Sequence, residues 1–89
     1  DYYALEVKGA SMVDDNILDG DVIVVRHQKN AQDGDRVVAI TEMGATLKVF
    51  RNRNGKVYLE PRNKSLTNIY PKELEIRGKF CGLIREDKL

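Results

Sequence analysis

The sequence predicts an all-β domain, a small, partly closed barrel of curled antiparallel sheets with almost no helix. Apolar residues alternate with polar ones at a period near two along most of the chain, as in half-buried strands. Asp-Gly and Asn-Gly pairs, which favour tight turns, separate these segments at short intervals. No long segment has the 3.6-residue period of an amphipathic helix. Together these observations favour curled antiparallel sheets.

The chain divides into seven expected strands and one short helical turn. In the first strand, Tyr3, Leu5 and Val7 alternate with polar or small residues, and Gly9 ends it. The helical turn is expected within 13–18, whose apolar residues share a face. The expected strands are residues 3–7, 22–26, 36–40, 45–50, 56–60, 74–78 and 79–85.

Local signals justify the later strands. Residues 22–26 contain a continuous β-branched run, which is typical of a strand buried on both faces. Asn54 and Gly55 predict a type I′ hairpin between the fourth and fifth strands. Pro61 closes the fifth strand because proline has no N–H to donate to a ladder. Gly78 is a candidate bulge, so the last two strands are either separate or one strand broken there.

Composition limits the classes of function. The 89 residues predict one domain, residues 1–89, and the net charge of +1 provides no basic surface for nucleic acid or membrane. The chain has one cysteine, Cys81, which rules out an internal disulfide and suits a reducing compartment. One histidine and one cysteine cannot make a zinc site, and phosphate-binding and metal motifs are absent. We therefore expect no metal and no cofactor.

Two residues are candidates for chemistry, although each also has an ordinary structural interpretation. Ser11 has the position of a turn or helix-cap residue. Lys48 shares one strand face with Thr46 and Phe50, and strand lysines are usually solvated. A Ser-His-Asp triad would require His27, whose polar surroundings favour a surface role instead. Considered together, the serine and the lysine suggest a Ser-Lys dyad.

The dyad makes a strong demand on Lys48. A general base must be neutral, and a free lysine with a pKa near 10.4 is neutral in only about one molecule in 2,500 at pH 7. Burial can lower that pKa by about 3 to 5, and a lowering of 3 costs about 4 kcal/mol of folding free energy. Apolar neighbours and a hydrogen bond to Thr46 are suitable surroundings for a neutral amine. The hypothesis therefore requires Lys48 to be buried.

Four collinear segments resemble the LexA repressor family of self-cleaving serine peptidases. VKGASMVDDNILDGDVIVV (7–25) is similar to the serine-containing segment, and GDRVVAI with ATLKVF (within 34–50) to the lysine-containing segment. LEPRN (59–63) and GKFCGLIR (78–85) resemble later segments. The order of these motifs, and the 37 positions between serine and lysine, make the resemblance specific and extend it over nearly all of the chain.

The resemblance implies a role for each site residue. Ser11 would be the nucleophile and Lys48 the general base. Met12 would pack beside the nucleophile and shape the cleft, and Thr46 would orient the lysine amine. Backbone N–H groups of Ser11 and a neighbour would form the oxyanion hole.

The resemblance also implies the setting of the reaction. The fold would be that of LexA and the signal peptidases, and the protein a cytoplasmic homodimer formed partly through its C-terminal strand. The scissile Ala-Gly bond of the family lies in the same chain, upstream of the serine. Contact with the RecA–single-stranded DNA filament stimulates cleavage during the SOS response to DNA damage. A separate N-terminal winged helix-turn-helix domain binds operator DNA.

Two features depart from the family pattern. The chain has no Ala-Gly pair and only ten residues before Ser11. We therefore expect the cleavage segment and the DNA-binding domain to be absent, as in a cleavage product or a trimmed form. Gly44 stands where some relatives have an acidic residue, which removes an ion-pair partner that would hold Lys48 charged.

Four alternatives share parts of this pattern. UmuD-type polymerase accessory proteins and phage repressors have the same dyad with other partners. Signal peptidases have a related serine and lysine arrangement, but they add a membrane anchor and larger insertions. A dimerisation module with a silent dyad is an alternative without catalysis.

Overall fold

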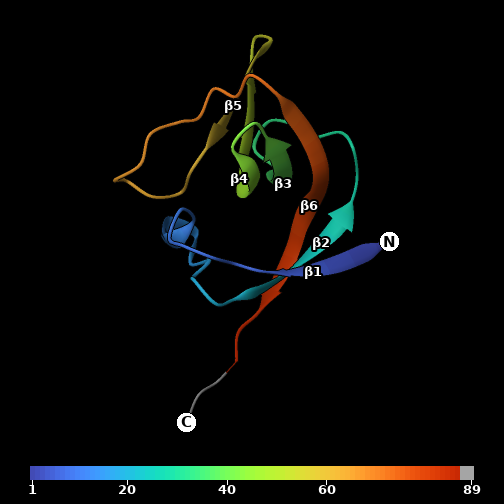
Figure 1. The fold of residues 1–89 in the computed structure, drawn as a ribbon, viewed down its shortest axis with the longest axis vertical. Coiled ribbons are helices and arrows are strands. Elements are labelled where there is room, and N and C mark those ends of the chain that lie inside the picture. The colour runs from blue at the N-terminus through green and yellow to red at the C-terminus, as the bar shows by residue number, and fades with distance from the viewer. Residues whose placement is uncertain (87–89) are drawn as a thin grey trace.

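One antiparallel sheet of six strands organises the protein in a computed structural model that describes residues 1–86. The strand order is β1-β2-β6-β3-β4-β5, and the sheet curls without closing (Figure 1). The all-β prediction is confirmed. The elements are β1 (Tyr2–Glu6), the 3₁₀ turn η1 (Val13–Asp15), β2 (Val22–His27), β3 (Arg36–Thr41), β4 (Gly44–Arg53), β5 (Lys56–Glu60) and β6 (Leu74–Ile84).

The last two predicted strands are a single strand, β6, at the centre of the sheet. This strand pairs with β2 on one side and β3 on the other. Val38 faces Gly78 while Ala39 faces Ile76, so Arg77 is the extra residue of a bulge beside the glycine. Of the two alternatives left open for residues 74–85, the single strand is therefore correct, and the sheet has six strands instead of seven because this bulge bends the strand without ending it.

Gly78 is required by the close approach of β2 to β6. A Cβ atom on this residue would lie 2.4 Å from Val25 Cγ1 and 2.7 Å from the carbonyl oxygen of Arg26. The backbone is therefore too near for any side chain. The strand pattern indicated Gly78 as a candidate bulge, and the structure shows that steric contact with β2 is the reason for a glycine at this position.

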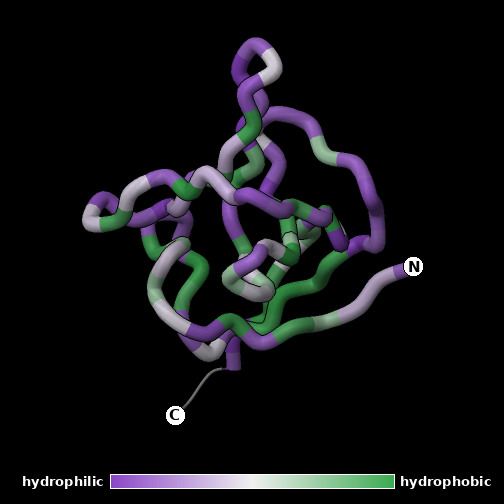
Figure 2. The backbone as a smooth tube through the Cα atoms, turned by 45° about the horizontal axis from the view of Figure 1, so that its top comes forward, coloured by the Kyte–Doolittle hydropathy of each residue, from purple (hydrophilic) through white to green (hydrophobic). Residues whose placement is uncertain are grey.

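The β4–β5 hairpin agrees with its turn signal. Asn54 and Gly55 have φ values of 56° and 85°, as a type I′ turn requires. The hairpin projects at the top of Figure 1. Its tip is hydrophilic, whereas hydrophobic segments run through the middle of the molecule (Figure 2).

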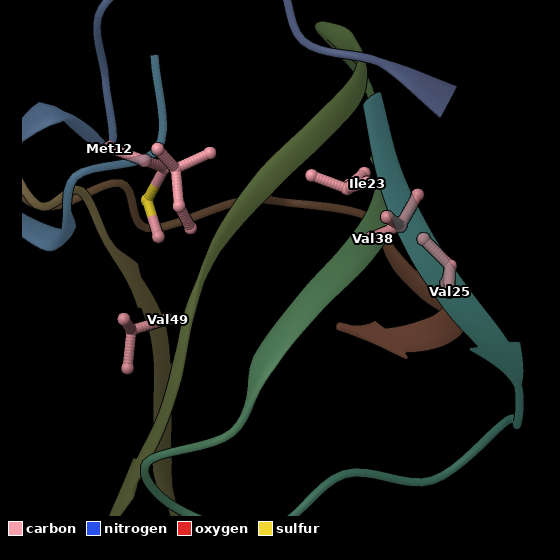
Figure 3. Close-up of a cluster of buried hydrophobic side chains, with 6 residues drawn as sticks. Met12, Ile23, Val25, Val38 and Val49 are labelled. Carbon is pink, nitrogen blue, oxygen red and sulfur yellow. The ribbon is translucent and has the colours of Figure 1, made fainter. Parts of the chain in front are cut away.

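Two apolar clusters cover the two faces of the curled sheet. Val37 packs in one cluster and Val38 in the other, so β3 is buried on both faces. In contrast, β2 buries Ile23 and Val25 but leaves Val24 between them half-buried. The prediction of burial on both faces for residues 22–26 holds only in part, because Val22 and Val24 are half-buried and Arg26 is exposed. The first cluster contains Met12, Ile17, Ile23, Val25, Val38 and Val49 (Figure 3).

The predicted helical turn is shorter than expected. The 3₁₀ turn η1 ends at Asp15 and is followed by Asn16, which adopts a left-handed conformation with φ of 58°. This change of direction separates the neighbouring apolar residues, so that Ile17 is buried in the first cluster whereas Leu18 is exposed. The apolar residues of 13–18 therefore do not share one buried face.

Candidate active site

Ser11 lies in a long loop whose two ends are joined. The Val7 N–H donates to the Asp21 carbonyl oxygen at 2.8 Å, and the Gly20 N–H donates to the Val7 carbonyl oxygen at 2.8 Å. The Gly9 N–H donates to the Asp19 carboxylate at 2.7 Å. Asp19, one of the acids between Ser11 and Val22, thus closes the base of the loop. The loop holds Ser11 away from the strand ladder.

Met12 anchors the serine to the core. Its side chain is 2% exposed and extends from the loop into the first apolar cluster (Figure 3). Its carbonyl oxygen accepts N–H donors from Asp15 at 3.1 Å and Ile17 at 3.3 Å. The residue next to Ser11 is therefore held by both packing and hydrogen bonds.

Lys48 reaches Ser11 from β4. The Lys48 Nζ atom lies 3.1 Å from Ser11 Oγ and 2.5 Å from Thr46 Oγ1. Lys48 is 8% exposed, and no salt bridge to it is found within residues 1–86. Burial lowers the pKa of the amine, because removal of water disfavours the ammonium form. The structure brings together the three polar residues that the sequence analysis selected.

A cleft of about 320 Å³ opens beside this group. The end of β1 and the residues after it line one side of the cleft, and the first half of β4 lines the other. The strand β4 pairs with β3 from Gly44 onward but with β5 only from Val49 onward. Residues 44–48 therefore have strand partners on one side alone within residues 1–86. Their other edge can accept an extended peptide.

A larger hollow of about 820 Å³ lies elsewhere and contains neither Ser11 nor Lys48. His27 lines this hollow, and its ring lies 4.3 Å from that of Tyr3. It is the last residue of β2 and takes no part in the serine site. Within residues 1–86, no group of three His, Cys, Asp or Glu residues could hold a metal ion.

The segment 61–63 contacts the serine loop, a role that the sequence analysis missed. The Arg62 N–H donates to the Ser11 carbonyl oxygen at 2.7 Å, and the Asn63 side-chain Nδ2 donates to the Ala10 carbonyl oxygen at 2.8 Å. The Asp14 N–H donates to the Arg62 carbonyl oxygen at 2.8 Å. The motif LEPRN was the available signal, but a pattern within one segment cannot name a partner about fifty positions away.

Ion pairs hold the serine loop against the sheet. The Asp15 carboxylate lies 2.7 Å from Arg36 Nε on β3 and 3.4 Å from Arg62 Nε. At the far end of the loop, the carboxylate of Asp21 accepts two hydrogen bonds from Arg85, each at 2.8 Å. These hydrogen bonds lower the pKa of Asp21 to about 2. The loop is thus fixed to the middle of the sheet and to the end of β6.

A serine hydroxyl beside a buried lysine amine, next to a cleft edged by an open strand, is a geometry that suits a serine peptidase. Comparison with protein families agrees with this class. The model of the Peptidase S24-like family matches residues 1–81, and the chain belongs to this family.

Curated relatives with the name LexA repressor confirm the resemblance that the motifs indicated. The chain is 48% identical over 87 residues to the LexA repressor of Cereibacter sphaeroides, covering 94% of this chain and 38% of the relative. It is 43% identical over 86 residues to that of Pelotomaculum thermopropionicum, covering 97% and 42%. LexA repressor 1 of Nocardia farcinica is 49% identical over 83 residues, covering 93% and 38%. The chain spans about two fifths of the length of these relatives.

No helix within residues 1–86 is long and apolar enough to cross a membrane.

Proposed function

We propose that this chain is the self-cleaving and dimerising domain of a LexA-type transcriptional repressor. Ser11 is the nucleophile, and neutral Lys48 is its general base. The observation that carries the proposal is the buried Lys48 Nζ atom 3.1 Å from Ser11 Oγ. A buried amine without a carboxylate partner is the state that a lysine base needs.

The chemistry follows from these atoms. Lys48 Nζ accepts the hydroxyl proton of Ser11 while Oγ forms a bond to the carbonyl carbon, whose oxygen becomes an oxyanion. Collapse of this tetrahedral intermediate breaks the C–N bond, and the Lys48 ammonium gives its proton to the leaving amine. Water then attacks the ester with Lys48 again as the base. This second step releases the new carboxyl group and returns the proton to Ser11.

Thr46 and the backbone of the serine loop assist the reaction in this proposal. The Thr46 hydroxyl lies within hydrogen-bond distance of the amine, so it can orient the lone pair of neutral Lys48 toward the serine. The N–H groups of Ser11 and Met12 have no acceptor within residues 1–86, which leaves both free to bind an oxyanion. Each such donor is worth about 10²–10³ in rate.

The proposed substrate is an extended Ala-Gly-containing segment of the same polypeptide, bound along the open edge of β4. In the full-length repressor, the RecA–single-stranded DNA filament promotes the cleavable conformation, and a separate domain binds operator DNA. These partners are inferred from the family resemblance. The LexA names of the relatives support a repressor of the SOS response.

A peptide assay tests the proposal. The chain is mixed with a peptide that contains Ala-Gly between apolar residues, and the rate of cleavage is followed by mass spectrometry from pH 7 to 10. We expect the rate to rise along one titration with an apparent pKa below 10.5, because burial lowers the pKa of Lys48.

Four variants test whether Ser11 is the nucleophile and Lys48 the base. Ser11→Ala and Lys48→Arg should each lower the rate at least about 1,000-fold, since the first lacks the nucleophile and the second stays charged. The matched controls Ser65→Ala and Lys56→Arg change exposed residues away from the cleft and should keep the rate within about twofold. Half of the normal rate in Lys48→Arg would show that Lys48 is not the base. No turnover at any pH would favour the non-catalytic dimerisation module.

A further inference from the structure

Two successive peptide groups of the serine loop are each held by a donor from the segment 61–63. The Asn63 side chain binds the carbonyl oxygen of Ala10, and the Arg62 N–H binds the carbonyl oxygen of Ser11. The first of these peptide groups carries the N–H of Ser11, and the second carries the N–H of Met12. The segment thus contacts both peptide groups that flank the nucleophile.

Because each peptide group is planar, a donor that fixes its carbonyl oxygen also fixes the direction of its N–H. The structure contains no cis peptide bonds in residues 1–86, and in a planar trans peptide the C=O and N–H bonds point in opposite directions. A donor that fixes the Ala10 carbonyl therefore fixes the Ser11 N–H to point away from the segment 61–63. A hydrogen bond to the carbonyl also polarises the peptide group and makes its N–H a stronger donor.

We infer that Asn63 is a positioning residue of the peptidase site, which orients and polarises the Ser11 N–H toward the oxyanion through the Ala10 carbonyl. This inference rests on the proposed function. Asn63 does not line the cleft, so it acts through the peptide group between Ala10 and Ser11. The Arg62 N–H has the same relation to the Met12 N–H, but only the Asn63 contact uses a side chain that mutation can change.

The two hydrogen-bond partners of the Asn63 side chain require an amide at this position. Asn63 Nδ2 donates to the Ala10 carbonyl at 2.8 Å, while Asn63 Oδ1 accepts the N–H of Ser65 at 2.8 Å. One partner is a pure acceptor and the other a pure donor, so the side chain must carry both functions on adjacent atoms. An aspartate keeps the shape and the acceptor for Ser65 but places an oxygen against the Ala10 carbonyl.

Asn63→Asp is therefore the test variant, with Asn68→Asp as its matched control. Asn68 is exposed in the same connection, and no side-chain hydrogen bond to it is found within residues 1–86. In the peptide assay, Asn63→Asp should lower kcat about 10- to 100-fold, somewhat less than the loss of an oxyanion donor. KM should stay near that of the parent chain, because Asn63 does not line the cleft. Asn68→Asp should leave kcat within about twofold.

A merely structural role would give a different result. In that case Asn63→Asp would lower the melting temperature while the rate per folded molecule stayed the same. Asn63→Ser, which removes the amide without adding charge, provides a second variant should the aspartate prevent folding. A kcat within twofold of the parent in a folded Asn63 variant would overturn the positioning role and leave the peptidase proposal standing.

NMR spectra, which do not depend on catalysis, test the positioning role of Asn63 separately from the peptidase proposal. In NMR spectra of the unliganded chain, the Ala10 carbonyl carbon and the Ser11 amide should shift in Asn63→Asp, because they belong to the peptide group that loses its donor. The same signals should be unchanged in Asn68→Asp. Unshifted signals in Asn63→Asp would refute the inference even if the parent chain cleaves peptide. If the parent chain cleaves nothing, the peptidase proposal fails, and the NMR result alone decides whether Asn63 orients this peptide group.

Discussion

Lys48 is a buried amine whose hydrogen-bond neighbours are two hydroxyl groups, those of Ser11 and Thr46. Each hydroxyl can donate to a neutral amine or accept from a charged one, whereas neither supplies the negative charge that would stabilise an ammonium. Desolvation therefore determines the direction of the pKa shift. The burial that disfavours the ammonium form of Lys48 in the folded chain also keeps the amine neutral for the proposed reaction.

Stability should depend on the protonation of Lys48. Burial lowers the folded-state pKa below 10.5, so between the two pKa values the unfolded chain binds more protons than the folded chain. Stability should therefore fall as the pH drops below 10.5 and level off below the folded pKa. Urea unfolding of the parent chain and Lys48→Met from pH 7 to 11 measures the difference. Parallel curves for the two proteins would contradict the burial of a titrating amine.

Asp21 gives a second pH-dependent contribution, at the end of the serine loop. Its pKa is lowered to about 2, mainly because Arg85 donates to it and then because the Leu18 N–H does. A carboxylate with a depressed pKa adds stability that is complete above its ordinary value of 3.8 and is lost as the pH falls toward 2. Asp21→Asn should reduce this acid-side loss, measured by urea unfolding from pH 2 to 6. Asp14→Asn, in the exposed part of the loop, is the control, and equal profiles for the two variants would refute the assignment.

Among the elements, β6 depends on one glycine. Gly78→Ala should lower the free energy of unfolding by about 1–3 kcal/mol or more, because the new methyl group meets Val25 and the backbone of β2. Gly82→Ala is a matched control in the same strand, since nothing lies within 4 Å of its added Cβ. Urea denaturation of both variants provides the comparison. A loss in Gly82→Ala as large as in Gly78→Ala would show that strand flexibility, rather than the close approach, is responsible.

The turn between β4 and β5 shows where local sequence patterns predict the structure correctly. Asn54 and Gly55 form the predicted hairpin because their left-handed conformations are set within two residues. The pairing of β6 between β2 and β3 involves strands that are distant in the chain. No local pattern distinguishes a strand broken at a glycine from a strand that continues through a bulge.

For the whole molecule, the proposed homodimer leads to a prediction about β6. Its pairing with β3 ends at Lys79, so residues 80–84 have an open edge on that side within residues 1–86. Ile84 in this part is 63% exposed. Ile84→Glu should weaken self-association at least tenfold by analytical ultracentrifugation, because it adds charge to an exposed strand edge. Met43→Glu, at the exposed β3–β4 turn, is the control, and equal association of all three proteins would count against an interface at β6.

The sequence by itself determined the all-β class, most strand positions and the hairpin, because alternation and turn chemistry act over a few neighbouring residues. It also selected Ser11, Lys48, Thr46 and Met12, where the family resemblance was needed because each residue also has an ordinary structural role. Only the tertiary structure decided that Lys48 is buried 3.1 Å from Ser11, and that Asn63 binds the loop from 53 positions beyond Ala10. Those contacts arise from the curling of the sheet, which brings distant segments together and removes water from the amine between them.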